Sequence, residues 1–110
     1  MSSSLFDLTG KSALITGSSQ GIGFALAKGL AASGAKIILN GRDRTKLQAA
    51  ADNLSTTGAD VQTLGFDATD HDAVRAAVDG FEDTSGTIDI LVNNAGMQHR
   101  TELENFPADA

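Results

Sequence analysis

The residues best suited to hold a charged ligand are the three glycines of the segment TGSSQGIG, residues 16–23. Gly17 permits a tight turn, Gly21 lets the backbone approach a ligand closely, and Gly23 lets a helix pack near a strand. A turn that leads into a helix N-terminus offers unpaired N–H groups and a partial positive charge, which favour phosphate. The segment therefore predicts a pyrophosphate site, with a purely structural turn as the alternative, because a lone glycine cluster is weak evidence.

The other side chains of this segment extend the candidate cofactor site. Ser18 and Ser19 are expected to place hydroxyl groups at its rim, and Gln20 and Ile22 complete the stretch. No Gly-Lys-Ser/Thr sequence follows, so no lysine reaches a β- or γ-phosphate, which argues against a P-loop.

The end of the second apolar run, Asn40-Gly41-Arg42, bears on the choice of cofactor. Sites that prefer NAD commonly carry Asp or Glu about 20 residues after the glycines, where the carboxylate binds the ribose 2′-OH. Here no carboxylate stands at the tip, and Arg42 can pair with a 2′-phosphate through its fork of donors. These residues predict NADP as cofactor, with NAD still possible. A solvent-exposed loop arginine is the alternative interpretation.

Two further segments end predicted strands on the same side. Asp67, followed by Ala68, could accept a hydrogen bond from an adenine amino group, although a turn or N-cap aspartate fits almost equally well. The later NNAG segment contains Asn94, Ala95 and Gly96, whose small and amide side chains suggest backbone that passes close to a cofactor; a plain turn is the alternative.

The elements that must position these residues alternate along the chain. Four short apolar runs predict strands at residues 12–16, 36–40, 61–66 and 88–92. Helical patterns lie between them, which implies a parallel sheet with right-handed crossovers and helices on both faces. The fold class is therefore α/β, a Rossmann-type parallel sheet with strand order 3-2-1-4. Strands that are covered on both faces are apolar almost throughout. These four runs are apolar in this way, so we expect both faces of the sheet to be covered.

The three helices are marked by apolar spacing and by caps. In the first, Ile22, Leu26 and Leu30 mark one face, with Ala25 and Gly29 between them. The other two are expected to begin at N-caps Asp43 and Asp70 and to bury residues at the i, i+3, i+4, i+7 spacing. Their predicted buried residues are Leu47, Ala50, Ala51 and Leu54, then Val74, Ala77, Val78 and Phe81.

Composition restricts the classes of protein. The 110 residues fit one domain, 41% hydrophobic and 20% charged, and the net charge of −6 disfavours nucleic acid and anionic membranes as partners. There is no cysteine, so thiolate metal sites and disulfides are excluded, and no metal site is expected. Neither a secretory signal nor a membrane-spanning run is visible, which favours a cytoplasmic protein.

With these positions in place, the chain resembles the short-chain dehydrogenases/reductases. The glycine segment matches that family's TGxxxGIG, Asp67 follows the third strand, and residues 93–96 match its NNAG. The resemblance implies that the glycine turn holds the pyrophosphate and adenosine ribose, that Asp67 meets adenine, and that NNAG lies beside the nicotinamide half. Gln20 departs from members that carry a basic residue there, which leaves recognition of a 2′-phosphate to Arg42 and the serines.

A narrower likeness is to the gluconate 5-dehydrogenase (5-keto-gluconate reductase) branch. It is carried by LNGRD, residues 39–43, and by NNAGMQHR, residues 93–100. It implies hydride transfer to or from a sugar acid or polyol, with Gln98 or Arg100 as candidate contacts to the substrate carboxylate.

The family's catalytic Ser, Tyr and Lys have no counterpart among these residues, since the chain contains no tyrosine. We therefore expect a single incomplete dinucleotide-binding domain over 1–110, truncated after the fourth strand, with a helix beginning near Pro107 and no catalytic residue of its own. Alone it is expected to be inactive and to form homo-oligomers, for instance through an exposed fourth strand. The alternatives are a non-catalytic nucleotide-binding or self-assembling module and, less well supported, a Rossmann-type methyltransferase.

Overall fold

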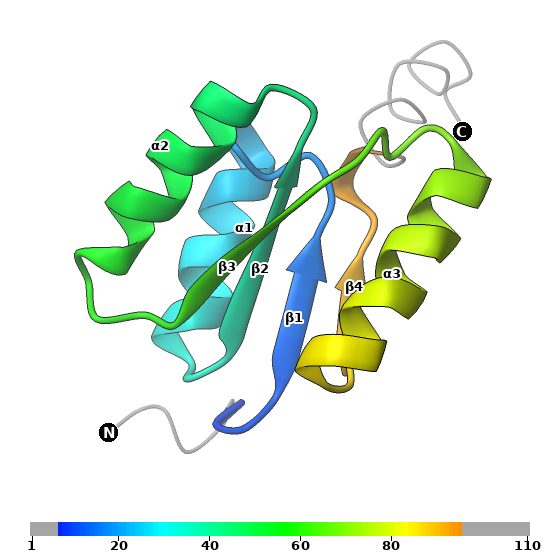
Figure 1. Cartoon of the computed structure of the whole chain (residues 1–110). Coiled ribbons are helices and arrows are strands. Elements are labelled where there is room, and N and C mark those ends of the chain that lie inside the picture. Colours follow the sequence, from blue (N-terminus) through cyan, green and yellow to red (C-terminus); the bar gives the residue numbers. More distant parts are fainter. Residues whose placement is uncertain (1–6, 96–110) are drawn as a thin grey trace, which may run out of the picture.

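The computed structural model describes residues 7–95, which form a four-stranded parallel sheet and three helices (Figure 1). The elements are β1 (Ser12–Ile15), α1 (Gly21–Ala32), β2 (Lys36–Gly41), α2 (Arg44–Ser55), β3 (Val61–Gly65), α3 (His71–Ser85) and β4 (Ile90–Val92). The strand order is β3-β2-β1-β4 and every pairing is parallel, which confirms the predicted Rossmann-type fold class. The helix expected near Pro107 lies outside the described residues.

The hydrophobic core lies between the sheet and the helices α1 and α2 (Figure 1), of which α1 packs on β1 and β2 and α2 packs on β2 and β3. The sheet contributes alternate residues of its two central strands: Ala13, Ile15, Ile37 and Leu39. Helix α2 buries the residues that its i, i+3, i+4, i+7 spacing predicted: Leu47, Ala50, Ala51 and Leu54. This packing fixes the carboxyl ends of β1 and β2 relative to each other.

Helix α1 packs on the sheet through a face that overlaps the predicted apolar stripe only in part. Its buried residues are Gly23 and Ala27, whereas Ile22 is 64% exposed and Leu26 is exposed as well. The reason is the close approach of the helix to the turn before it. A Cβ atom on Gly23 would come within 2.7 Å of Asn94 Nδ2. A small residue is required where α1 meets the turn, whereas Phe24 and Leu30 are partly buried and pack against the core. The predicted stripe is therefore exposed at Ile22 and Leu26 and holds at Leu30.

The opposite face of the sheet is covered less completely than the apolar strands predict. Helix α3 begins at its expected cap, Asp70, and turns its apolar stripe inward, but none of its residues is fully buried. Leu91 in β4 is 55% exposed. The expectation that the strands are covered on both faces is therefore wrong for β4 and also for β3, none of whose residues is buried. Within residues 7–95, β4 pairs with β1 alone and forms an edge of the sheet.

Candidate functional site

The carboxyl ends of the strands enclose a crevice of about 490 Å³ that brings together most of the predicted cofactor residues. Because the strands are parallel, the segments that follow β1, β2, β3 and β4 all meet at this edge of the sheet. The predicted residues that line the crevice are Gly17, Ser19, Gln20, Gly21, Asn40, Arg42, Asp67, Ala68 and Ala95.

Four predicted residues do not line this crevice. Ser18 and Asn94 are buried, Gly23 is the helix-packing glycine described above, and Ile22 points to the surface. The expectation that both serines place hydroxyls at the rim is therefore wrong for Ser18 and holds for Ser19 alone. The remaining predicted residues, Gly96, Gln98 and Arg100, lie outside the described residues.

Two buried amide side chains hold the first glycine of the turn. Gly17 has a φ of +60°, which glycine adopts at little cost. Its N–H donates to Asn40 Oδ1 at 2.9 Å, and its carbonyl oxygen accepts from Asn94 Nδ2 at 3.1 Å. Each asparagine is only 1% exposed. Both polar groups of Gly17 are thus engaged within the protein, which fixes the direction in which the next residues leave the strand.

Asn40 also connects the glycine turn to the end of β3. Its Nδ2 donates to the carbonyl oxygens of Leu64, at 3.0 Å, and Phe66, at 3.2 Å. Its backbone N–H donates to Ser18 Oγ at 2.9 Å, and that hydroxyl donates to the carbonyl of Ile15 at 2.6 Å. Asn40 lines the crevice, but its side-chain amide is fully used inside the protein. Its evident role is to position the turn and the Phe66–Asp67 segment relative to each other.

The N-terminus of α1 is open, unlike those of the other two helices. Asp43 accepts a hydrogen bond from the N–H of Lys46 and so caps α2, and Asp70 caps α3 through the N–H groups of Asp72 and Ala73. At α1 the N-cap is Gln20, whose side chain makes no capping bond, and the first turn holds no acidic residue. Its unpaired N–H groups and positive dipole end therefore face the crevice and suit a phosphate.

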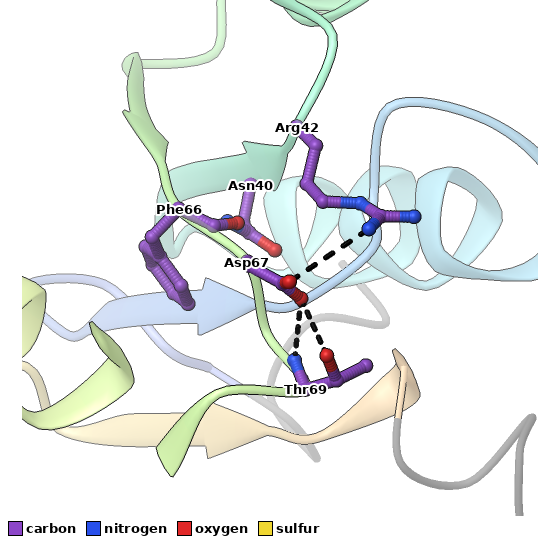
Figure 2. A network of polar contacts seen from close by, with 5 residues as sticks. All are labelled: Asn40, Arg42, Phe66, Asp67 and Thr69. Atoms are coloured by element: carbon purple, nitrogen blue, oxygen red, sulfur yellow. Dashed lines mark hydrogen bonds and ion pairs between the residues drawn. The ribbon is translucent and has the colours of Figure 1, made fainter. Parts of the chain in front are cut away.

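The far end of the crevice holds an ion pair between two strand ends (Figure 2). Arg42 follows β2, Asp67 follows β3, and their side chains point toward each other with 3.7 Å between Nη1 and Oδ2. Asp67 Oδ1 accepts from the backbone N–H and the hydroxyl of Thr69, at 2.9 and 2.6 Å. These bonds from Thr69, with a smaller contribution from Arg42, hold the pKa of Asp67 below its ordinary value, so the group is a carboxylate at neutral pH.

The structure adds residues that the sequence reasoning missed. Thr69 lines the crevice and orients Asp67, and Lys46, from the first turn of α2, lines it as well. The signal for Thr69 was the Asp-x-Thr spacing after β3, which is typical of an Asx turn. No sequence signal distinguishes Lys46, because Arg44 is a second cation in the same first turn of α2. Residues 7–95 hold no cluster of His, Cys, Asp and Glu suited to a metal, and none of their helices is long and apolar enough to cross a membrane.

A parallel sheet in this order, with a glycine turn and an open helix N-terminus at its carboxyl edge, is the architecture of Rossmann-type nucleotide-binding proteins. Comparison with known proteins narrows this class. The family model described as short chain dehydrogenase matches residues 11–110, and the chain therefore belongs to the short-chain dehydrogenase family. The resemblance that TGxxxGIG, Asp67 and NNAG indicated is thereby confirmed at the level of the family.

Individual relatives agree with this assignment. The chain is 50% identical over 102 residues to gluconate 5-dehydrogenase of Gluconobacter oxydans (strain 621H). The matched region covers 93% of this chain and 40% of that enzyme. It thus spans about two fifths of that enzyme's length. The crystal structure of a gluconate 5-dehydrogenase from Burkholderia cenocepacia J2315 in complex with NADP and tartrate superposes with a TM-score of 0.78. Its identity is 46%, and the match covers 86% of this chain and 37% of that one. The crystal structure of L-sorbose reductase from Gluconobacter frateurii, complexed with NADPH and L-sorbose, superposes with a TM-score of 0.74. Its identity is 42%, and the match covers 83% of this chain and 36% of that one.

Proposed function

We propose that residues 1–110 bind NADP(H) as the cofactor-binding part of an oxidoreductase that transfers hydride to or from a sugar acid or polyol, of which gluconate and 5-keto-gluconate are the first candidates. The single observation that carries the proposal is the open N-terminus of α1 at a crevice whose far end holds Arg42. The similarity to gluconate 5-dehydrogenase and to NADP-bound structures supports the choice of substrate class and cofactor.

The residues present fit the cofactor in charge and shape. The unpaired N–H groups of α1 suit the pyrophosphate, and Gly21, where an added Cβ would meet no atom within 4 Å, leaves room for its approach. Arg42 suits a 2′-phosphate, and Asp67 beside it is an ionised acceptor that is oriented by Thr69 and Arg42. When bound, the nicotinamide accepts or gives the hydride, while the protein supplies binding and orientation.

We propose further that these 110 residues alone do not turn over substrate. Hydride transfer at an alcohol carbon needs a group that exchanges the hydroxyl proton, and the tyrosine that does so in the family is absent from a chain without any tyrosine. Substrate contacts by Gln98 and Arg100 remain predictions. We expect the protein to work in the cytoplasm.

The proposal is tested by calorimetric titration of the chain with NADPH and NADH. We expect NADPH to bind at least about tenfold more tightly than NADH, a difference of about 1.4 kcal/mol. Supplying the remaining length of the Gluconobacter enzyme as a second chain should then give gluconate-dependent formation of NADPH. Equal or absent binding of the two cofactors would reject an NADP site, and binding without any turnover in the second assay would favour a non-catalytic module.

Self-association is a separate proposal that one observation favours. Leu91 is 55% exposed on β4, an edge of the sheet among the described residues, and bare apolar edges recruit other chains. We expect light scattering to show dimers or larger species at high micromolar concentration and Leu91→Lys to shift the chain toward the monomer. A wild-type chain that stays monomeric at these concentrations would contradict the proposal.

A further inference from the structure

We propose that Lys46 is a specificity-determining residue, whose ammonium group binds the 2′-phosphate of the cofactor together with Arg42. This inference rests on the proposed NADP site and goes beyond it, because it assigns a second cation to one phosphate. No sequence motif points to Lys46; the structure brings it to the crevice.

The position of Lys46 suits this role. Lys46 lines the same crevice as Arg42 and Gln20, and it also lines a shallow neighbouring hollow whose walls include Ser19 and Gln20. It therefore lies beside the glycine turn, whereas Arg42 lies on the side of the crevice that reaches Asp67. A group seated between them would meet cations from two sides. The Lys46 backbone is itself fixed, because its N–H donates to Asp43 Oδ1 at 3.1 Å.

The charges around the crevice also suit the binding of a phosphate by Lys46. The crevice is lined by two carboxylates and two cations, but both carboxylates already have donors: Asp43 caps α2, and Asp67 is held by Thr69 and Arg42. In residues 7–95 the ammonium of Lys46 forms no ion pair. Within that part of the chain, the crevice thus contains a free cation and no free carboxylate, which is the arrangement that a dianionic phosphate requires.

The helix position of Lys46 is itself unfavourable for a cation. The first turn of a helix carries the positive end of the dipole, which disfavours a cation and favours Asp or Glu. The first turn of α2 contains no acidic residue and two basic ones, Arg44 and Lys46. Arg44 lines a neighbouring hollow of about 440 Å³, which shares Arg42, Phe66 and Asp67 with the crevice but includes neither Lys46 nor the glycine turn. Both residues are exposed cations of the same turn, but only Lys46 lines the crevice that contains the glycine turn, so Arg44 is a matched control.

The test is a calorimetric titration of Lys46→Gln, Lys46→Arg and Arg44→Gln with NADPH, NADH, adenosine 2′,5′-bisphosphate and AMP. Exposed charge-assisted contacts are worth about 1 kcal/mol, so Lys46→Gln should weaken NADPH and the bisphosphate about fivefold and leave NADH and AMP within about twofold. Lys46→Arg should restore most of the lost affinity, and Arg44→Gln should leave all four constants within about twofold. Thermal melting verifies that each variant is folded.

Three results would overturn the inference. An unchanged NADPH constant in Lys46→Gln would show that the ammonium does not touch the phosphate. Equal weakening of NADPH and NADH would assign Lys46 a general role in the turn. Equal effects of Lys46→Gln and Arg44→Gln would show that both side chains act only through the overall electrostatic field of the protein. Failure of the proposed function looks different, because the wild-type chain would then not distinguish NADPH from NADH at all.

Discussion

The three helices begin at the same edge of the sheet, but their N-termini are treated in two different ways. Helices α2 and α3 are closed by carboxylates of their own, Asp43 and Asp70. Helix α1 begins at Gly21, its N-cap Gln20 makes no side-chain cap, and the turn before it is held by the buried side-chain amides of Asn40 and Asn94, which bind Gly17. A closed N-terminus stabilises the helix, whereas an open one leaves N–H groups for a ligand.

This contrast explains how the fold reserves a binding site. The same backbone groups exist at all three helix starts, so the sequence decides their use by what it places at the cap. At α1 a carboxylate is missing and the turn is instead held by Asn40 and Asn94, which bind the N–H and the carbonyl of Gly17 and leave the N–H groups at the start of the helix to a ligand. Substitutions that disturb the held turn should therefore cost both stability and cofactor binding, whereas a substitution at the α1 cap should separate the two.

The first prediction, with the largest expected effect, concerns the packing of α1. Gly23→Ala places a Cβ 2.7 Å from Asn94 Nδ2 and 2.9 Å from the Cα of Ser18, so the turn must shift. We expect a loss of about 1–3 kcal/mol in the free energy of unfolding and no measurable NADPH binding. Urea unfolding and calorimetry measure the two effects.

Gly29→Ala is the matched control, because it lies in the same helix and a Cβ there meets no atom within 4 Å. It should stabilise the chain by about 0.5–1 kcal/mol and leave binding intact. If both variants behaved alike, the close approach of α1 to the turn would have no role in the site.

The second prediction removes the amide that holds the turn from β2. Asn40→Ala leaves the Gly17 N–H and the carbonyls of Leu64 and Phe66 without their partner. We expect a loss of about 2 kcal/mol in stability and NADPH binding weakened by about tenfold, since buried unpaired groups cost about 1–3 kcal/mol. The exposed Asn53→Ala on α2 should change stability by less than about 0.5 kcal/mol. A stable Asn40→Ala chain with normal affinity would contradict the positioning role.

The third prediction converts the open N-terminus into a closed one. Gln20→Asp supplies the carboxylate that α2 and α3 already have, at an extended N-cap position that accepts it. We expect the helix to gain about 0.5–1 kcal/mol while NADPH binding weakens about tenfold, because the carboxylate takes the N–H groups and repels phosphate. The reverse change at α3, Asp70→Ala, should cost about 1 kcal/mol and leave the NADPH affinity unchanged. Tighter NADPH binding in Gln20→Asp would refute the contrast between open and closed helix starts.

The smallest expected effect concerns Asp67, whose pKa is lowered mainly by the hydrogen bonds from Thr69 and less by Arg42. The pKa of Asp67 lies below its ordinary value, so its contribution to stability is present above the unfolded-state pKa of about 3.9 and is lost as pH falls through the folded value. The melting temperature of Asp67→Asn should therefore lie slightly below that of the wild type at pH 7, and the difference should shrink below about pH 4 and vanish in stronger acid. If the difference in melting temperature grew on acidification, the result would contradict a lowered pKa of Asp67.

Much of the fold could be predicted from the sequence because its signals are local. The apolar runs, the spacing in α2 and the caps Asp43 and Asp70 all follow from period and hydrogen bonding within a few residues. The face of α1 could not be predicted in this way. Ile22 and Leu26 form the most apolar stripe, but contact with the glycine turn selects Gly23 and Ala27, and that contact involves Asn94, far along the chain.

The candidate site likewise contains some residues that the sequence predicts and others that depend on tertiary contacts. The glycines, Arg42 and Asp67 are each recognisable from where a strand ends, and the structure gathers them at one crevice. The burial of Ser18, the internal role of the Asn40 amide and the presence of Lys46 depend on how β1, β2, β3 and α2 lie side by side. A single sequence read segment by segment contains no sign of such contacts.

Whether the open start of α1 is the cofactor site can be tested by titrating the ¹⁵N-labelled chain with NADP⁺ and following the amide chemical shifts of the three helix N-termini. We predict the largest shifts in the amides of Ser19 to Gly23, at the open end of α1, and little change in Asp72 and Ala73, at the capped end of α3. Shifts of equal size at both helix starts, or none at the glycine turn, would contradict this assignment.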